Sequence, residues 1–135
     1  MLHDIGKLVL WARRPDVYAG AAQDARGSGR PLYEVEVERL GVSHAEIGAY
    51  LLGLWGLPYP IVEAVANHHD PSRVKEQGSF GALGAAHVGE FLSGHAGDDG
   101  AGSRIDEAYL RGLGVLNELP KWQSLAEQEA EGLDA

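Results

Sequence analysis

The sequence SHAEIGAYLLGLW, residues 43–55, contains the clearest helix signal in the chain. Ser43 is followed three residues later by Glu46, which makes a capping box that satisfies free N–H groups at a helix start. Beyond this box, apolar residues recur at helical spacing. They are Ile47, Leu51, Leu54 and Trp55. The stretch therefore predicts a helix with one apolar stripe.

Further helix signals lie on both sides of this stretch, and Pro and Gly residues mark their boundaries. The helices expected upstream cover residues 2–13, 15–26 and 31–40, with a turn at 27–29 and Gly41 closing the third. The helices expected downstream cover residues 60–69 and 79–93, a short segment led by a capping box of Ser103 and Asp106, and the chain from Pro120 onward. Residues 94–102 are expected to be a flexible loop and 127–135 a frayed acidic tail. No segment alternates convincingly as a strand does, so the sequence predicts one all-α domain over residues 1–135.

The bulk composition narrows the class of protein. The chain has 135 residues and 44% hydrophobic residues, the ordinary range for a soluble domain with a real core. It contains no cysteine, so any bound metal needs nitrogen and oxygen ligands. The net charge of −9 counts against a nucleic-acid polymer as partner. Without a membrane-length apolar run or a signal peptide, we expect a cytoplasmic protein.

Histidines and an aspartate stand at the ends of the expected helices, where they border the core. His3 and Asp4 are adjacent, Lys7 lies one turn further on, His44 is the first residue after a helix cap, and His68-His69 ends a helix. Imidazole and carboxylate together suit Mn, Fe, Zn, Ni or Mg-type ions. Because adjacent helical residues diverge by about 100°, His3 and Asp4 can contact different ions, or the carboxylate can bridge two. Such a pair of ions activates water for attack on phosphorus, and Lys7 is placed to stabilise a phosphoryl oxygen.

Each of these residues alone also has an ordinary structural explanation. A His-Asp pair occurs by chance, Lys7 alone would be a surface lysine, and two histidines at a helix C-terminus favour the helix dipole. The interpretation as a site therefore depends on the combination and its order. The two remaining histidines have no partner in the pattern: we expect His87 to be a helix-packing residue and His95 to be solvated.

The combination resembles the HD superfamily of metal-dependent phosphohydrolases. The segment LHDIGK, residues 2–7, matches the His-Asp motif that names the superfamily. Residues 43–58, 61–69 and 105–114 are similar to the HDOD branch, whose domains often follow a receiver or other signalling module in bacteria. The resemblance covers most of the chain and implies an all-α, HD-superfamily helical bundle.

A related family, HD-GYP, cleaves cyclic di-GMP at a centre of two or three metal ions, and its likeness implies a ligand set. The metal ligands would be His3, Asp4, His44, His68 and His69, and Lys7 would contact phosphate. Glu90 is the counterpart of the superfamily's final Asp and would be a further ligand. The implied cofactor is one or two divalent ions (Fe, Mn, Zn, Ni or Mg), and the implied catalytic residues are Asp4 and Lys7.

Three departures from those families affect the predicted function. The chain reads HDPS at residues 69–72, without the Gly-Tyr-Pro segment of HD-GYP, which argues against cyclic di-GMP cleavage. Glu90 is one methylene longer than the usual Asp. The superfamily's first His lies upstream of the His-Asp pair, whereas this chain starts at Met1 inside an expected helix, so we expect missing upstream sequence, with one or both ions absent as a consequence.

These features leave three functions open. The preferred one is a regulatory HDOD module for signal transduction, which binds metal structurally or weakly and contacts a protein partner or an upstream receiver-type module. The second is an active phosphohydrolase or phosphodiesterase acting on a small phosphate ester, a nucleotide or a cyclic dinucleotide. The third is a purely structural helical protein. A homodimer is compatible with the first two.

Overall fold

The computed structural model describes residues 2–74, 78–96 and 104–133, and every regular element in these ranges is a helix. The predicted all-α fold is therefore confirmed. In chain order the elements are the 3-10 turn η1 (Leu2–Asp4), α1 (Ile5–Arg13), α2 (Pro15–Ser28), α3 (Leu32–Leu40), α4 (His44–Leu54), α5 (Tyr59–Asn67), the 3-10 turn η2 (Pro71–Arg73), α6 (Ala82–Ala96), α7 (Glu107–Gly112), the 3-10 turn η3 (Leu116–Glu118) and α8 (Leu119–Leu133). None of the helices in the described part of the chain has the length and apolar character needed to cross a membrane.

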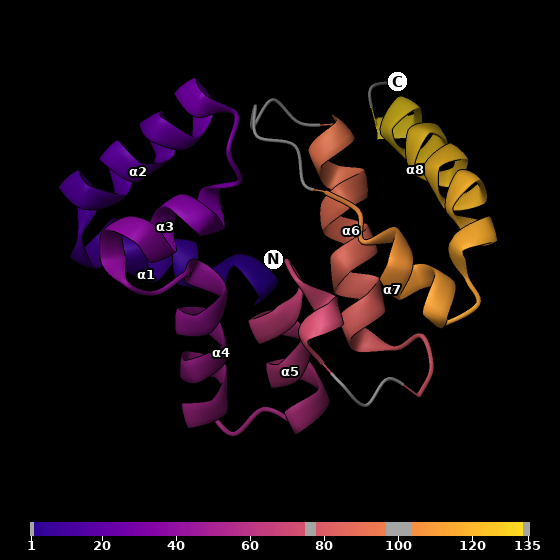
Figure 1. The fold of residues 1–135 in the computed structure, drawn as a ribbon, viewed down its shortest axis with the longest axis horizontal. Helices are drawn as coiled ribbons and strands as arrows, with labels where there is room; N and C mark the ends of the chain where they lie inside the picture. Colours follow the sequence, from indigo (N-terminus) through magenta and orange to yellow (C-terminus); the bar gives the residue numbers. More distant parts are fainter. Residues whose placement is uncertain (1, 75–77, 97–103, 134–135) are drawn as a thin grey trace.

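Figure 1 shows two groups of helices that meet at α5 and α6. The first group is α1 to α5, drawn from indigo to magenta, and the second is α6 to α8, drawn in orange and yellow. The N-terminal turn η1 lies at the centre of the molecule, where it contacts both α4 and α5. The first residues of the chain are therefore placed next to the segments that carry the later histidines.

Three clusters of buried apolar side chains hold these helices together. Ala21, Ala25 and Val35 join α2 to α3, and Ala49, Leu52 and Val65 join α4 to α5, with Ile5 of α1 packed against them. The third cluster joins α5, α6 and α7, and its buried members are Ala64, Leu83, Val88, Tyr109 and Leu110. Burial of apolar surface of this kind contributes about 25 cal/mol per Å², so packing rather than helix propensity fixes the arrangement.

Two glycines allow α1 to approach α4 closely. A Cβ atom built on Gly6 would lie 1.8 Å from the carbonyl oxygen of His44, and one on Gly48 would lie 3.2 Å from the Gly6 nitrogen. Any side chain at position 6 would therefore separate the two helices. Because His3 and Asp4 directly precede α1, and His44 is the first residue of α4, this contact sets how near these three residues come to one another.

The helix boundaries match the predicted pattern, with corrections at several ends. Ser43 caps α4 as predicted, since its Oγ accepts a hydrogen bond from the Glu46 N–H at 3.3 Å. The predicted helix at 60–69 ends at Asn67, so His68 and His69 follow the helix instead of closing it. The helix expected at 79–93 spans Ala82–Ala96 instead. The Phe80 ring before it folds back to within 2.6 Å of where a Gly84 Cβ would lie.

The C-terminal third differs more from the predictions. The flexible segment expected at 94–102 starts later than predicted, since residues 94–96 continue α6, and 97–102 lie outside the described residues. Ser103 also lies outside them, and Asp106 is itself the cap of α7, because its Oδ1 accepts the Tyr109 N–H at 2.9 Å. The tail predicted to fray after Ala126 remains helical to Leu133, and Leu119 and Trp122 at the start of this helix pack against the third cluster.

Candidate metal centre

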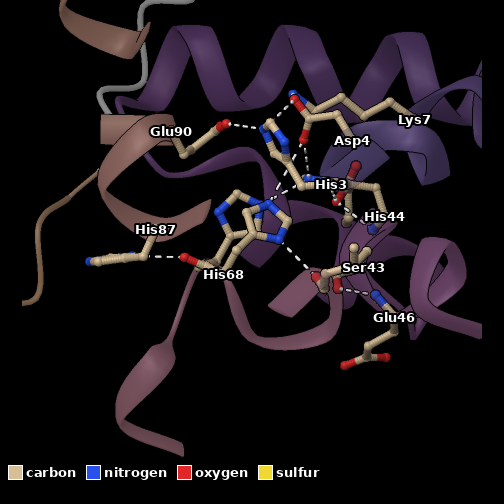
Figure 2. Close-up of polar contacts among 12 residues, drawn as sticks. His3, Asp4, Lys7, Ser43, His44, Glu46, His68, His87 and Glu90 are labelled. Atoms are coloured by element: carbon tan, nitrogen blue, oxygen red, sulfur yellow. Dashed lines mark hydrogen bonds and ion pairs between the residues drawn. The ribbon is translucent and has the colours of Figure 1, made fainter. Parts of the chain in front are cut away.

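The fold brings all six predicted metal ligands together at the junction of η1, α4, α5 and α6 (Figure 2). Their ligand atoms form two overlapping groups, and within each group all atoms lie within 4.8 Å of one another. The inner quartet consists of Asp4, His44, His68 and His69, and the outer quartet consists of His3, Asp4, His68 and Glu90. Both groups contain three or more nitrogen and oxygen donors, the donor set that divalent transition ions take in the absence of thiolates.

Asp4 lies between the two quartets and presents one carboxylate oxygen to each. Its Oδ1 is 3.3 Å from His44 Nε2 and 3.8 Å from His68 Nε2, while its Oδ2 is 3.5 Å from His3 Nε2 and 3.4 Å from Lys7 Nζ. The two oxygens therefore face different sets of groups, which is the geometry required of a carboxylate that bridges two ions.

His68 is shared by the quartets but can serve only one ion at a time. Its Nδ1–H donates to the Val65 carbonyl oxygen at 2.7 Å, which leaves the Nε2 lone pair directed into the centre. A neutral imidazole has one such lone pair. If both ions are present, Asp4 is the bridge between them and His68 belongs to one quartet.

His44 is held in place by Glu36, a residue that was missed in the sequence analysis. Glu36 is fully buried, and its Oε1 accepts hydrogen bonds from both the His44 Nδ1–H at 2.6 Å and the His44 backbone N–H at 2.9 Å. A carboxylate behind a histidine fixes the ring orientation and raises the basicity of the other nitrogen. The sequence did contain a signal, because Glu36 lies four residues from both Leu32 and Leu40 and is thus a glutamate on the apolar stripe of its helix.

His69 contacts both the centre and a neighbouring pocket. Its Nε2 lies 2.9 Å from His44 Nε2, and Tyr33 stacks on its ring with centroids 4.5 Å apart. The pocket has a volume of about 400 Å³, large enough for a small ligand. It is lined by Arg30, Tyr33, Glu34, Val37, Ser43, Ala45, Glu46, Ala66, His69, Asp70 and Arg73.

The outer quartet contains a direct pair between an imidazole and a carboxylate. His3 Nε2 and Glu90 Oε2 lie 2.8 Å apart, and the His3 ring meets the His68 ring edge-on at 5.0 Å between centroids. The side chains of His3 and Glu90 are 22% and 17% exposed, whereas those of His44 and His68 are 1% and 0% exposed. The outer quartet is therefore the more exposed half of the centre, while His69 of the inner quartet is also only partly buried.

The pKa shifts in the centre favour charged carboxylates and neutral imidazoles. Burial alone would raise the pKa of Asp4, but the His44 hydrogen bond and the charges of Lys7 and His3 outweigh it and hold the pKa well below its usual range. The His3 hydrogen bond lowers the pKa of Glu90. Burial lowers the pKa of His68 to about 4, and burial together with the neighbouring imidazoles lowers the pKa of His69.

His44 behaves differently from the other imidazoles. Burial would lower its pKa, but hydrogen bonds to Asp4 and Glu36 raise it above the ordinary value. A proton on His44 Nε2 is therefore favoured by the two carboxylates that flank the ring. His44 Nε2 could hold a divalent cation in place of that proton, because the same two carboxylates would balance its charge.

The residues present fit a bound cation by two observations. Three buried side-chain atoms in the described part of the chain make no hydrogen bond of good geometry. One is Glu36 Oε2, on the carboxylate behind His44. The other two, Asp4 Oδ1 and His68 Nε2, lie 3.8 Å apart in the centre, where Asp4 Oδ1 has only the 3.3 Å polar contact with His44. Buried polar atoms without partners cost about 1–3 kcal/mol each, and both of these atoms are directed at the same small volume. A divalent ion at that point would accept both lone pairs.

The other residues named from the sequence are placed as follows. Lys7 lies beside the Asp4 carboxylate, as its position one turn further on predicted. His87 is buried, in agreement with a packing role, but both of its ring nitrogens bond to backbone groups. The side chain of His95 lies outside the described residues.

Comparison with known proteins agrees with this geometry. A model of the HDOD domain matches residues 1–71, more than half of the 135-residue chain, and the chain therefore belongs to the HDOD family. The matched span contains every candidate ligand except Glu90.

The chain is also similar to part of one curated protein. Over 77 residues the chain is 27% identical to an uncharacterized protein of Treponema pallidum (strain Nichols). The match covers 57% of this chain but only 15% of the relative, so the chain corresponds to a small part of that protein. No solved structure matches the chain.

Proposed function

We propose that this chain is an HDOD signal-transduction domain of a bacterial cytoplasmic protein, and that it holds one or two divalent metal ions on His3, Asp4, His44, His68, His69 and Glu90. The observation that carries the proposal is the convergence of these side chains into two quartets around one carboxylate. Segments up to 87 positions apart in the chain meet there, as in the His3–Glu90 contact. A set of unrelated packing histidines has no reason to direct its free nitrogens at one point.

The inner quartet is the stronger metal site in this proposal. Two of its three histidines, His44 and His68, are buried, and Glu36 and the Val65 carbonyl fix their rings. The outer quartet takes a second ion, with Asp4 Oδ2, His3 and Glu90 as its protein ligands. Imidazole and carboxylate ligands suit Mn, Fe, Ni or Zn, with Mg bound less well because it prefers oxygen.

The regulatory role follows from family membership together with the exposure of the outer quartet. In this role the metal centre stabilises the contact between η1, α5 and α6, and a protein partner or an upstream receiver-type module senses that arrangement. A second copy of the chain is a further candidate partner.

A specific observation also favours phosphohydrolase activity as a second candidate function. Lys7 Nζ lies 3.4 Å from Asp4 Oδ2, at the side of the carboxylate that faces the more exposed quartet, and a pocket of about 400 Å³ borders His69. A pair of bound divalent ions supplies an activated water and charge neutralisation for attack on a phosphoester. Lys7 would bind a phosphoryl oxygen, and a small phosphate ester or nucleotide is the substrate class that fits.

Elemental analysis of the purified protein tests the metal centre. We expect transition metal at close to one or two equivalents, and loss of one equivalent in His68→Ala, because the His68 Nε2 can serve one ion. The matched control is Tyr50→Ala, which removes an exposed side chain from α4. A substitution of His87 is not a suitable control, because His87 contacts His68. Metal-free wild-type protein after purification and incubation with each ion would contradict the proposal.

Turnover of bis(p-nitrophenyl) phosphate by the metal-loaded protein separates the two functions. Hydrolysis that is lost in Asp4→Ala and reduced in Lys7→Ala, with metal content unchanged in the latter, supports the phosphohydrolase. Metal binding without hydrolysis supports the regulatory module alone. The typical contribution of one positioned cation to such a reaction is about 10²–10³-fold in rate.

A further inference from the structure

The His68–His69 turn is held from behind by a second buried histidine, His87 of α6. His87 is 3% exposed, and its Nδ1–H donates to the His68 carbonyl oxygen at 2.7 Å (Figure 2). Its Nε2 accepts the backbone N–H of Asp106 at 2.9 Å. Both ring nitrogens are thus occupied by backbone groups, which fixes the tautomer and excludes His87 itself as a metal ligand.

Asp106, which bonds to the Nε2 side of His87, is itself held by several contacts. Asp106 caps α7 through the Tyr109 N–H, and its other carboxylate oxygen accepts a hydrogen bond from Ser72 of η2. The Tyr109 ring lies edge-on to His87 at 6.1 Å between centroids. His87 therefore connects the turn after α5 to a rigid helix start and is not free to rotate.

The position of His87 matters because of where His68 and His69 stand. They follow the last residue of α5, and the Asp70 N–H donates to the Asn67 carbonyl oxygen at 3.0 Å to close a turn around them. Two successive side chains must point into the same centre, with ring centroids only 3.9 Å apart. The hydrogen bond from His87 is a tertiary contact that anchors the carbonyl group between these two residues.

We propose that His87 is a positioning residue for the metal centre, which acts through the His68 carbonyl and holds the His68–His69 pair in its ligand geometry. This inference rests on the proposed metal centre and adds to it a residue that binds no ion. Loss of the hydrogen bond should let the turn relax and move both imidazoles, whereas the rest of the centre remains intact. Residues behind a metal ligand typically change metal affinity by about 10- to 100-fold.

Three substitutions at this position separate the two hydrogen bonds. His87→Leu removes both bonds. His87→Asn places an amide N–H where Nδ1–H was and keeps the bond to His68, whereas His87→Gln places an amide near Nε2 and keeps the contact with Asp106. Leu83→Ala is the control, because Leu83 lies on the same helix in the neighbouring apolar cluster and touches no candidate ligand by any contact described above.

The experiment is a titration of each full-length variant with Co²⁺, followed by visible absorption, whose bands report the ligand geometry. We expect His87→Leu to weaken Co²⁺ binding by about 10- to 100-fold and to change the spectrum, His87→Gln to resemble it, and His87→Asn to retain near wild-type binding. Leu83→Ala should lower thermal stability but leave the affinity and spectrum unchanged. If His87→Leu does not fold, the Co²⁺ affinities of the other two variants still test the proposal. His87→Asn should bind Co²⁺ more tightly than His87→Gln, and equal or reversed affinities would overturn the role of His87.

The same titration separates this inference from the metal centre on which it rests. Wild-type protein that binds no Co²⁺ would overturn the metal centre. Wild-type binding that persists unchanged in His87→Leu would overturn the positioning role alone.

Discussion

The two halves of the candidate metal centre differ in how the protein supports them. In the inner quartet, Glu36 holds His44, the Val65 carbonyl holds the ring of His68, and His87 holds its backbone. In the outer quartet, His3 and Glu90 bond to each other and are partly exposed. Each half contains a direct contact that an ion would replace, His44–His69 at 2.9 Å in the inner quartet and His3–Glu90 at 2.8 Å in the outer quartet. The inner half differs because partners behind its rings already fix their orientation. Pre-organised ligands cost less to bind, so two ions should bind with unequal affinity.

The largest expected effect is at Asp4, the residue that belongs to both halves. Asp4→Ala removes the carboxylate that faces His44 and His68 on one side and His3 on the other. We expect both ions to be lost, since the inner quartet would then hold imidazoles alone and the outer quartet would keep Glu90 as its single carboxylate. Isothermal titration calorimetry with Mn²⁺ checks this prediction. Residual tight binding of one ion would show that Asp4 is a ligand in a single quartet.

The next largest effect is expected at the glycine contact that brings the halves together. Gly6→Ala places a methyl group 1.8 Å from the His44 carbonyl oxygen, so α1 must move away from α4. We expect a loss of about 3 kcal/mol or more in the free energy of unfolding, at the upper end of overpacking effects, together with weakened metal binding. Urea unfolding measures the loss.

Gly53→Ala is the matched control for that substitution. It lies on α4, and a Cβ there meets nothing within 4 Å, so helix propensity alone should make it neutral or stabilising by up to about 1 kcal/mol. Equal destabilisation by the two substitutions would contradict the close approach of α1 and α4.

Removal of one ligand from each half tests the difference between them directly. His44→Ala should abolish the tight binding step and His3→Ala only the weak one, because the buried ring has fixed partners and the exposed one does not. Two-step Mn²⁺ titration curves for the two variants report which step disappears. Loss of the same step in both variants would mean that the six residues form one site for one ion.

The smallest of these effects is expected at Glu36, which touches no ion. Glu36→Gln keeps an oxygen that accepts the two His44 N–H bonds but removes the charge, so metal affinity of the inner quartet should fall by about tenfold. Glu36→Ala leaves both donors without a partner and should cost more in both affinity and stability. If both variants bound metal as tightly as the wild type, Glu36 would have a packing role and no effect on the metal site.

The parts of this molecule that could be predicted from sequence are those governed by local rules. The Ser43 cap and the helices around it depend on residues three or four positions apart, so their positions were predicted closely. The candidate ligands were predicted from their order along the chain, and the structure brings all of them together. Their metal-binding role remains a prediction.

The residues behind the ligands are harder to predict because their partners are remote in sequence. His87 contacts a carbonyl 19 residues away and an N–H 19 residues away in the other direction, and neither contact has a local signature. The predicted end of α8 was wrong for a related reason. The polar sequence after Ala126 suggests fraying, yet Trp122, near the start of this helix, packs on Phe80 with ring centroids 5.1 Å apart, a tertiary contact no local rule gives.

A crystal structure of the protein grown with Mn²⁺, with anomalous diffraction, tests the central claim most directly. We expect an anomalous peak within about 2.0–2.3 Å of the inner-quartet ligand atoms, and at higher Mn²⁺ a second peak on the other side of the Asp4 carboxylate. Absence of a peak at saturating Mn²⁺, or a peak bound elsewhere on the surface while these side chains keep their direct contacts, would contradict it.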